Sequence, residues 1–487
     1  MACAASDISR IEDRVIRLRQ GHTGGWDLVF DNNRDGRPKP ILYNFVTLVP
    51  MPSTRRSILA TCTTGIGALA GCISTEKPTA DGSWPRRTLN NSHTGYSTTE
   101  GPTTDLHTVW HRERLRSGGV DPSPVVDNGV LYFAYSQESR SDERGGAWIE
   151  AFDAATGDSR WTTELFRTDE FHYFYHSDST VVDGDRIILQ TKPGVTMLTT
   201  DGEVQWTFDN LSRGQQLPDA VTPVVTDDVV VTGTYSTVVD DHQDETVYGI
   251  DPATGDERWS VPFPERTSMW QLAGTNDVVY VPFSHDALVA LDLATGEERW
   301  RWEGSITGTP TVVNDLLLVP LWHQDDDQHT LVALDRGDRS LRWQRSIGPR
   351  WSDAGVTVAD GLIYHAAAFG LEARRLETGE RVWRFGPDEG KRPQGEPQVD
   401  LVSTPVVSGD AVYATGWIQR DTMYGHLFVV DAATGAELGR AELGRNEDAG
   451  KGTPAVTSDL VFLGSNRGNL HAFGECSFEV AGRCLVG

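Results

Sequence analysis

The sequence is poor in lysine and rich in acidic residues. Only five of its 487 residues are lysine, whereas 70 are Asp or Glu, and the formal net charge is −27. A surface with many carboxylates and few lysines keeps a protein soluble where salt screens charge strongly. We therefore expect a protein from a halophilic archaeon; the alternative is an acidic protein from a mesophile. Because such a surface repels phosphate groups, it argues against nucleic acid as a partner.

Cysteine is also scarce, with five residues in the whole chain. Two of them, Cys476 and Cys484, lie near the C-terminus with seven residues between them. Two cysteines provide too few ligands for a structural zinc site. In an exported protein such a pair indicates a disulfide, and two buried thiols are the alternative.

No apolar run near the N-terminus is long enough to span a membrane stably, since the one from 58 to 70 is short. It follows the pair Arg55 and Arg56 and ends in Leu-Ala-Gly before Cys72. Twin arginines, a short apolar run and this ending are typical of an exported lipoprotein whose cysteine carries a lipid. An ordinary signal peptide with an incidental cysteine is the alternative. We expect anchoring at the extracytoplasmic face of the cell membrane.

A signal of this kind normally begins close to a start codon, and Met51 supplies one. Residues 1–50 hold six acidic and seven basic residues, unlike the rest of the chain. We interpret them as a mis-called extension. The expected organisation is an extension at 1–50, a signal peptide at 51–71, a tether and entry segment at 72–104, a repeat domain at 105–475 and a tail at 476–487.

One phrase recurs along the chain, as in ALDLATGEERW at 290–300. Its Asp can accept hydrogen bonds from the turn amides, and its Gly permits the positive φ of a tight turn. The tryptophans follow one another at intervals of 40 to 53 residues, a spacing typical of repeat folds. A large flat side chain at one position per repeat is suited to burial between units. We expect seven residues to dock each unit on the next: Trp110, Trp161, Trp206, Trp259, Trp300, Trp343 and Trp383.

A second pattern precedes most of these tryptophans. In SPVVDNGVLYFAY from 123, a Val-rich run, a polar turn and a second apolar run indicate a β-hairpin. A third strand and the tryptophan-bearing strand complete four antiparallel strands. Eight such units occur; the last lacks an outer strand, whereas 106–115 forms a strand without a unit. We predict an all-β, eight-bladed β-propeller of four-stranded antiparallel blades, closed by an N-terminal strand that completes the last blade.

The phrase resembles the tryptophan-docking repeat of quinoprotein alcohol dehydrogenases and their non-catalytic relatives, and WPRRTLNNSHTGYS at 84–97 is similar to the entry segment of PQQ-like β-propeller repeat proteins. The resemblance covers about residues 84–475 and is specific for fold. One departure is Gly439, which stands where blade seven should have tryptophan. For an enzyme of this family the resemblance implies pyrroloquinoline quinone (PQQ), calcium and a catalytic carboxylate. Its alcohol-oxidising members commonly carry an adjacent Cys-Cys pair, which is missing here.

Long connections between the second and third strands are expected in blades one, three, five and seven, on the face that also bears the blade-to-blade connections. Long loops on a rigid scaffold often carry binding sites. Aromatic residues concentrate in the blade connections on the same face and form a candidate partner patch, although packing beneath the loops is the alternative. The patch comprises Phe171, Tyr173, Phe174, Tyr175, Trp270 and Trp351.

Two acidic loops contain histidine, at 240–244 and 323–329, and oxygen-rich loops can bind calcium. Neither has the order of an EF-hand, so solvated loops are the better interpretation, and we predict no metal site. Five aspartates occupy blade connections, but none can be matched to a calcium ligand or a base: Asp121, Asp178, Asp219, Asp353 and Asp400.

Two classes of function are therefore open. The first is a monomeric, surface-anchored binding or assembly scaffold for a protein partner, similar to the propeller lipoproteins that assist the assembly of bacterial outer-membrane proteins. This class needs no cofactor and no catalytic residue. The second is an exported PQQ- and calcium-dependent oxidoreductase acting on alcohols or sugars. The missing cysteine pair and the unmatched ligands favour the first.

Overall fold

The computed structural model divides the chain into two units, Met1–Cys72 and Ile73–Gly487. In the first unit, β1 (Val15–Gln20) pairs with β2 (Trp26–Asp31) as an antiparallel hairpin. The structure describes residues 15–20, 26–31, 78–113, 123–137, 144–168, 179–191, 194–211, 221–234, 245–264, 269–323, 328–348, 355–367, 370–387, 398–401, 403–419, 422–445, 447, 452–476, 478–480 and 483–486.

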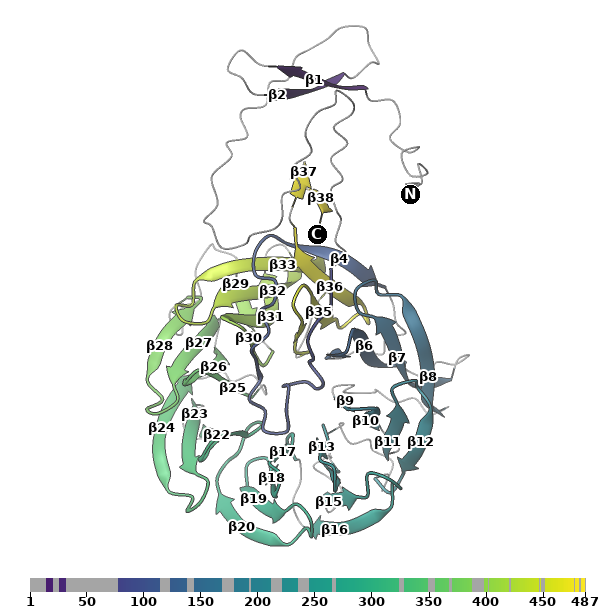
Figure 1. The fold of residues 1–487 in the computed structure, drawn as a ribbon. Coiled ribbons are helices and arrows are strands. Elements are labelled where there is room, and N and C mark those ends of the chain that lie inside the picture. The colour runs from purple at the N-terminus through teal and green to yellow at the C-terminus, as the bar shows by residue number, and fades with distance from the viewer. Residues whose placement is uncertain are drawn as a thin grey trace, which may run out of the picture. The chain divides into compact units, whose positions relative to one another are not determined.

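The second unit is a β-propeller of eight blades, arranged in a ring in Figure 1. Blade 1 contains β5 (Val125–Asp127), β6 (Val130–Gln137), β7 (Gly145–Asp153) and β8 (Ser159–Thr168), and blade 2 contains β9 (Val181–Asp183), β10 (Arg186–Thr191), β11 (Gly194–Thr199) and β12 (Val204–Phe208). Blade 3 contains β13 (Val224–Val225), β14 (Val230–Gly233), β15 (Glu245–Ile250) and β16 (Glu257–Phe263), and blade 4 contains β17 (Ala273–Gly274), β18 (Val278–Pro282), β19 (Ala287–Asp292) and β20 (Glu298–Glu303).

Blades 5 to 8 repeat the pattern. Blade 5 contains β21 (Thr311–Val313), β22 (Leu316–His323), β23 (Gln328–Asp335) and β24 (Leu341–Gly348), and blade 6 contains β25 (Thr357–Ala359), β26 (Leu362–Ala367), β27 (Gly370–Arg375) and β28 (Arg381–Phe385). Blade 7 contains β29 (Gln398–Leu401), β30 (Val406–Ser408), β31 (Ala411–Gln419), β32 (Met423–Asp431) and β33 (Glu437–Arg445). Blade 8 contains β34 (Ala455–Val456), β35 (Val461–Gly464), β36 (Leu470–Glu475) and β4 (Leu106–Arg112), and the short hairpin of β37 (Phe478–Val480) and β38 (Arg483–Val486) follows.

The predicted fold class is confirmed, including the closure of the ring. β4 pairs antiparallel with β36, so the N-terminal strand supplies the outer strand of blade 8. Because closure joins the first and last blades, it removes the open ends that a linear array of blades would leave. None of the described residues forms a helix, and no described segment meets the length and hydropathy of a membrane-spanning helix.

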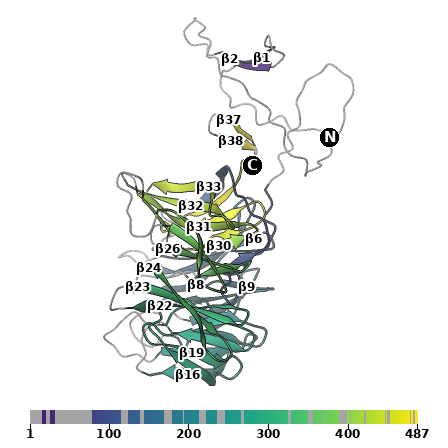
Figure 2. The ribbon, with the colours of Figure 1, turned by 90° about the vertical axis from the view of Figure 1, so that its left-hand side faces the viewer.

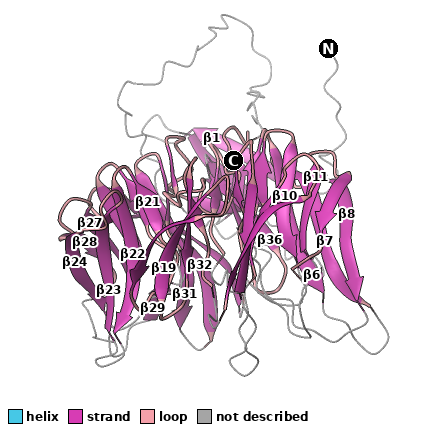
Figure 3. Cartoon of the chain, turned by 90° about the horizontal axis from the view of Figure 1, so that it is seen from below, coloured by secondary structure: helices cyan, strands magenta, loops and turns pink. Residues whose placement is uncertain are grey.

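The two faces of the propeller differ in their connections. The turn face carries the tight turns between strands one and two and between strands three and four. The loop face carries the connections between strands two and three and between blades; Figure 3 shows the blades from the side, with loops and turns in pink. On the loop face, the second and third strands of blades 1, 5 and 7 have eight or nine residues each, whereas those of blades 2, 4, 6 and 8 have four to six. Figure 2 shows the long strands of blades 5 and 7.

An outer circle of tryptophans joins neighbouring blades. Six of the seven repeated indoles donate a hydrogen bond to a backbone carbonyl of the next blade, as Trp206 does to Pro252 at 3.0 Å. The glycine of the next turn packs on the ring, and a Cβ on Gly255 would lie 2.8 Å from Trp206. At the seventh, Trp300, the next blade has Arg339 instead, whose guanidinium lies 5.8 Å from the ring centroid. Each docking contact therefore needs a small or flat group opposite the indole.

The aspartate of the repeated phrase has two partners. Asp292 accepts hydrogen bonds from the amides of Ala294 and Thr295, both at 3.0 Å, and pairs with Arg299 at 2.8 Å. The same Asp–Arg pair, seven residues apart, recurs in blades 1, 3 and 5. In blades 1, 3, 4 and 5 the phrase thus forms the turn and attaches it to the strand that carries the docking tryptophan.

An inner circle lines the axis of the ring, where the sequence predicted only an entry segment. Residues 81–97, which we call the inner segment, contact the first strand or first turn of every blade in order around the ring, as the dark trace at the centre of Figure 1 shows. The backbone amides of Val182, Val312, Val358 and Val407, for example, donate to carbonyls of the segment at 2.8 to 2.9 Å. The exposed edge of each short inner strand therefore has a partner.

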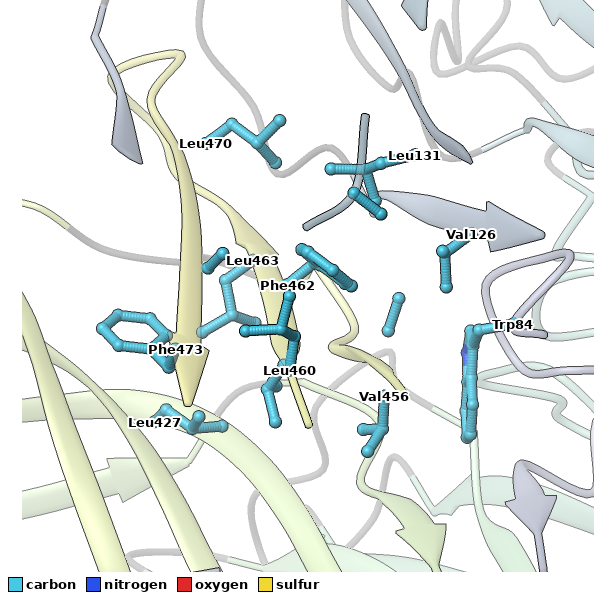
Figure 4. Close-up of a cluster of buried hydrophobic side chains, with 14 of the residues drawn as sticks. Trp84, Val126, Leu131, Leu427, Val456, Leu460, Phe462, Leu463, Leu470 and Phe473 are labelled. Atoms are coloured by element: carbon cyan, nitrogen blue, oxygen red, sulfur yellow. The ribbon is translucent and has the colours of Figure 1, made fainter. Parts of the chain in front are cut away.

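Trp84 anchors the start of the inner segment. Its side chain is fully buried, and Figure 4 shows it beside Val126 of blade 1 and Val456 of blade 8. This apolar cluster joins blades 7, 8 and 1, so among the described residues the point of ring closure has the most extensive core. After Tyr96–Ser97 (β3), which pairs with β30, the chain leaves the axis on the turn face and becomes β4.

Candidate functional site

A step forms on the loop face where short blade 4 meets tall blade 5. Blade 4 turns back at His285, whose φ is 57°, whereas β22 of blade 5 continues to His323. Trp322 lies at this raised end, and its ring centroid is 5.0 Å from that of His285. The amide of Trp322 donates to the carbonyl of Ser305 at 2.9 Å, which attaches the raised strand to the connection between the two blades.

Two further tryptophans lie near the loop-face end of blade 4. Trp270 and Trp302 are half-buried and pack against a cluster that includes Leu288 of blade 4 and Leu321 of blade 5. The backbone places them there because the amide of Trp270 bonds to Pro282, Pro282 pairs with Leu288, and Leu288 pairs with Trp302. We call Trp270, His285, Trp302 and Trp322 the aromatic step.

Polar groups accompany these rings. The indole Nε1 of Trp270 is buried and has no hydrogen-bond partner among the described residues. Glu303 follows Trp302 in β20 and is exposed on the opposite side of the strand, and Arg301 pairs with Glu298. Partly exposed aromatic faces suit a partner segment with apolar surface and can also bind a positive charge.

Of the predicted patch, the structure places Trp270 in the aromatic step. The other five members, Phe171, Tyr173, Phe174, Tyr175 and Trp351, lie outside the described residues. Sequence reasoning missed His285, Trp302 and Trp322. Trp302 had a signal, since it follows the docking residue Trp300 by two positions, and Trp322 directly precedes a long acidic loop.

The axis of the ring was the other candidate, because a quinone enzyme of similar fold would need a charged centre. The inner segment brings Arg86, Asn91 and His93 there. Arg86 donates to the side chain of Asn91 and to the carbonyl of Pro223, and burial lowers the pKa of Arg86 to about 10. Asn91 in turn bonds to the amide and the carbonyl of Val225, at 3.1 and 2.7 Å.

His93 is nearly inaccessible and donates from Nε2 to the carbonyl of Leu272 at 2.6 Å. Burial lowers the pKa of His93 to about 3, so the imidazole is neutral at pH 7. Residues 84–97 contain two arginines and one histidine and no carboxylate. The inner segment therefore does not fit a calcium–quinone centre, which requires acidic oxygen ligands.

The acidic loops give no described metal site. Within the parts of the chain that the structure describes, no three His, Cys, Asp or Glu side chains lie close enough to hold a metal ion. His323 and His329 lie at the ends of β22 and β23, while 324–327 and 235–244 fall outside the described residues. Of the five aspartates in blade connections, Asp400 in β29 is described.

Two buried carboxylates are already paired. Glu372 accepts hydrogen bonds from Arg374 at 2.7 Å and Arg384 at 2.6 Å; burial opposes its ionisation, but His365 and Arg374 outweigh it and hold the pKa of Glu372 well below its usual value. Glu447 lies 2.7 Å from His471. Burial acts against this carboxylate too, yet its hydrogen bonds, first that of His471, lower the pKa of Glu447 to about 2. Glu372 therefore forms ion pairs that join strands of blade 6, and the contact of Glu447 with His471 joins the connection after blade 7 to blade 8.

The export and anchoring predictions concern other residues. Arg55, Arg56 and Cys72 lie outside the described residues, as does the side chain of Cys484. Cys476 follows β36, and its amide donates to the carbonyl of Asp105 at 3.1 Å. Lipidation at Cys72 and the pairing of Cys476 with Cys484 stay predictions.

The family described as outer membrane protein assembly factor BamB matches residues 103–240 and 243–477. No curated protein sequence matches the chain. Solved structures with a similar fold include a quinohemoprotein alcohol dehydrogenase from Comamonas testosteroni, with a TM-score of 0.60, 14% identity and coverage of 83% of this chain and 82% of that one. BamB from Moraxella catarrhalis has a TM-score of 0.50, 17% identity and coverage of 76% and 99%. A europium-containing methanol dehydrogenase has a TM-score of 0.57, 13% identity and coverage of 81% and 98%.

Proposed function

The chain belongs to the family of the outer membrane protein assembly factor BamB, and we propose that it is a non-catalytic, lipid-anchored propeller that binds a protein partner outside the cytoplasm. Cys72 carries the anchor, and the export signal contains Arg55 and Arg56. The propeller acts as a monomer and as a rigid scaffold. Its partner binds the loop face, on which the aromatic step lies.

The observation that carries this proposal is the partial exposure of the aromatic step on a closed ring. The docking tryptophans and the inner segment join the blades, and Trp270 and Trp302 add packing between blades 4 and 5. Trp302 and Trp322 nevertheless remain half-exposed, and His285 is exposed. Aromatic side chains supply much of the binding energy at protein interfaces, and Trp is the most enriched of them.

The residues that line the axis of the ring support the same proposal. Between residues 84 and 97 the inner segment carries two arginines, Arg86 and Arg87, and the buried neutral His93, and no carboxylate. Arg86 and His93 donate hydrogen bonds to neighbouring backbone carbonyls and offer no oxygen ligand to a divalent cation. Their role is therefore structural, and we also call the inner segment the strap.

Replacement of Trp302 and Trp322 by Ala tests the binding surface. Partner capture from native membranes in high salt should weaken by about 2 kcal/mol or more, roughly a 30-fold loss of affinity, if these residues are interface anchors. Leu341→Ala is the matched control, since Leu341 is 56% exposed and lies outside the step. Capture of the same protein by wild type and by the control, with loss in the double variant, supports the proposal. Equal capture by all three shows that the step is not the binding site.

The alternative is an exported PQQ- and calcium-dependent oxidoreductase acting on alcohols or sugars. Its support is the likeness of fold to a quinohemoprotein alcohol dehydrogenase and to a europium-containing methanol dehydrogenase. Purified protein incubated with the quinone and calcium distinguishes the two readings. Bound-cofactor absorbance together with dye-linked oxidation of an alcohol would replace the scaffold proposal, whereas absence of both agrees with it.

A further inference from the structure

The chain enters the propeller on the turn face. Thr79 donates from its amide and its hydroxyl to the carboxylate of Asp459, at 2.8 and 2.7 Å, and the amide of Ser458 donates to the carbonyl of Asp81 at 2.9 Å. Ser458 and Asp459 lie in the tight turn between β34 and β35 of blade 8. The first attachment of the chain to the ring is therefore a turn-face contact.

The chain between this contact and the proposed anchor is short. Thr79 follows Cys72 by seven residues. A fully extended chain spans at most about 3.5 Å per residue, so the contact with Asp459 lies within about 25 Å of the lipid-bearing cysteine.

To reach the loop face, the tether would have to be fully extended along the most direct path over blade 8. A tether running to the loop face would have to pass β36 and β4, a lateral distance of about 10 Å at strand spacing. It would then follow the seven residues of β4, about another 23 Å at the rise of a strand. The route through the axis is lined by the inner segment, which the same chain forms.

We propose that the turn face is held toward the membrane and that the loop face, with the aromatic step, points away from it. This inference rests on the proposed lipid anchor at Cys72. It identifies the kind of partner: a soluble protein, or the water-exposed domain of a membrane protein, that approaches from the side opposite the lipid.

The charge of the turn face agrees with a tethered position and not with adsorption. Seven of the eight turns between strands one and two carry an exposed aspartate: Asp185, Asp227 or Asp228, Asp277, Asp315, Asp360, Asp410 and Asp459. A ring of carboxylates is repelled by anionic lipid at low salt, and the repulsion is screened within about 3 Å at 1 M salt. The anchor therefore holds near the membrane a surface that would not bind lipid alone.

Fluorescence quenching tests the orientation. Single labels are placed on the turn face through Asp227→Cys, a fully exposed position, and on the loop face through Glu303→Cys. Each protein, with its lipid, is reconstituted in high salt on vesicles that carry a quencher on the lipid headgroups. The label at position 227 should lose most of its fluorescence, and the label at position 303 should retain most of it.

Two further variants test whether the quenching depends on the anchor and on the length of the tether. Cys72→Ser should abolish quenching at both labels, and an insertion of about 20 Gly/Ser residues after Glu76 should reduce the difference between the labels, because the tether then reaches either face. Equal or stronger quenching at position 303 in the unaltered chain overturns the orientation while leaving the anchor and the partner intact. Failure of the lipidated chain to remain on the vesicles overturns the anchor itself, and with it this proposal; partner capture is measured separately.

Discussion

The outer and inner circles of the propeller both hold the blades together, but they do so through different kinds of contact. The outer circle repeats one contact, an indole against the turn of the next blade, so each docking joins only two neighbours. The inner circle is one continuous strap that contacts all eight blades and repeats no motif. Local repeats therefore make each interface, whereas a single segment keeps the assembled interfaces together as one ring.

The largest effect on stability is expected from replacing most of the strap. Replacement of residues 84–97 by a Gly/Ser segment of equal length should lower the free energy of unfolding by at least about 5 kcal/mol, because buried backbone groups lose partners and Trp84 leaves its cluster. Trp206→Ala, on the outer circle, should cost about 3 kcal/mol. Denaturant unfolding in the same high salt measures both.

Hydrogen exchange can distinguish the effects of these two changes. Faster exchange after Trp206→Ala should be confined to blades 2 and 3, which its indole joins, whereas the replaced strap should affect inner strands all around the ring. If the strap replacement costs less than Trp206→Ala, the distinction between the two circles is wrong.

A smaller effect is expected where the two circles meet. Blade 7 has Gly439 at the docking position, and a Cβ there would lie 2.3 Å from the carbonyl oxygen of Thr103, on the chain between the strap and β4. Gly439→Trp, which restores the repeat, should therefore destabilise the protein by about 2 kcal/mol through overpacking. Arg440→Trp at the adjacent exposed position is the control and should cost less than about 1 kcal/mol. A stabilising Gly439→Trp would show that the crossing chain can move aside.

The smallest effect concerns pH. Burial lowers the pKa of His93 in the strap to about 3, against about 6.5 in an unfolded chain. Unfolding below pH 6.5 takes up a proton at His93, so its contribution to stability is present above that pH and is lost as the pH falls toward 3. Between pH 7 and pH 5 the loss should be about 1–2 kcal/mol. His93→Gln should flatten this part of the stability curve, and an unchanged slope would assign the proton uptake to other groups.

The candidate site shows where sequence reasoning reaches its limit. The tryptophans of the repeated phrase were identifiable because the same residue recurs at one position of each unit. Trp270, Trp302 and Trp322 carry no such periodicity, since they meet only where a short blade adjoins a tall one. The alternation of long and short connections was visible in the sequence, but the step it creates depends on which side of each strand faces the neighbouring blade.

The sequence by itself determined the number of blades, the four-stranded unit, the turn chemistry and closure by an N-terminal strand. All of these depend on residues that are close along the chain or that recur at a regular spacing. Only the tertiary structure decided that 81–97 lines the axis, that Gly439 gives room to Thr103, and that the chain enters on the turn face. These features depend on single contacts between residues hundreds of positions apart, and no local pattern or period records them.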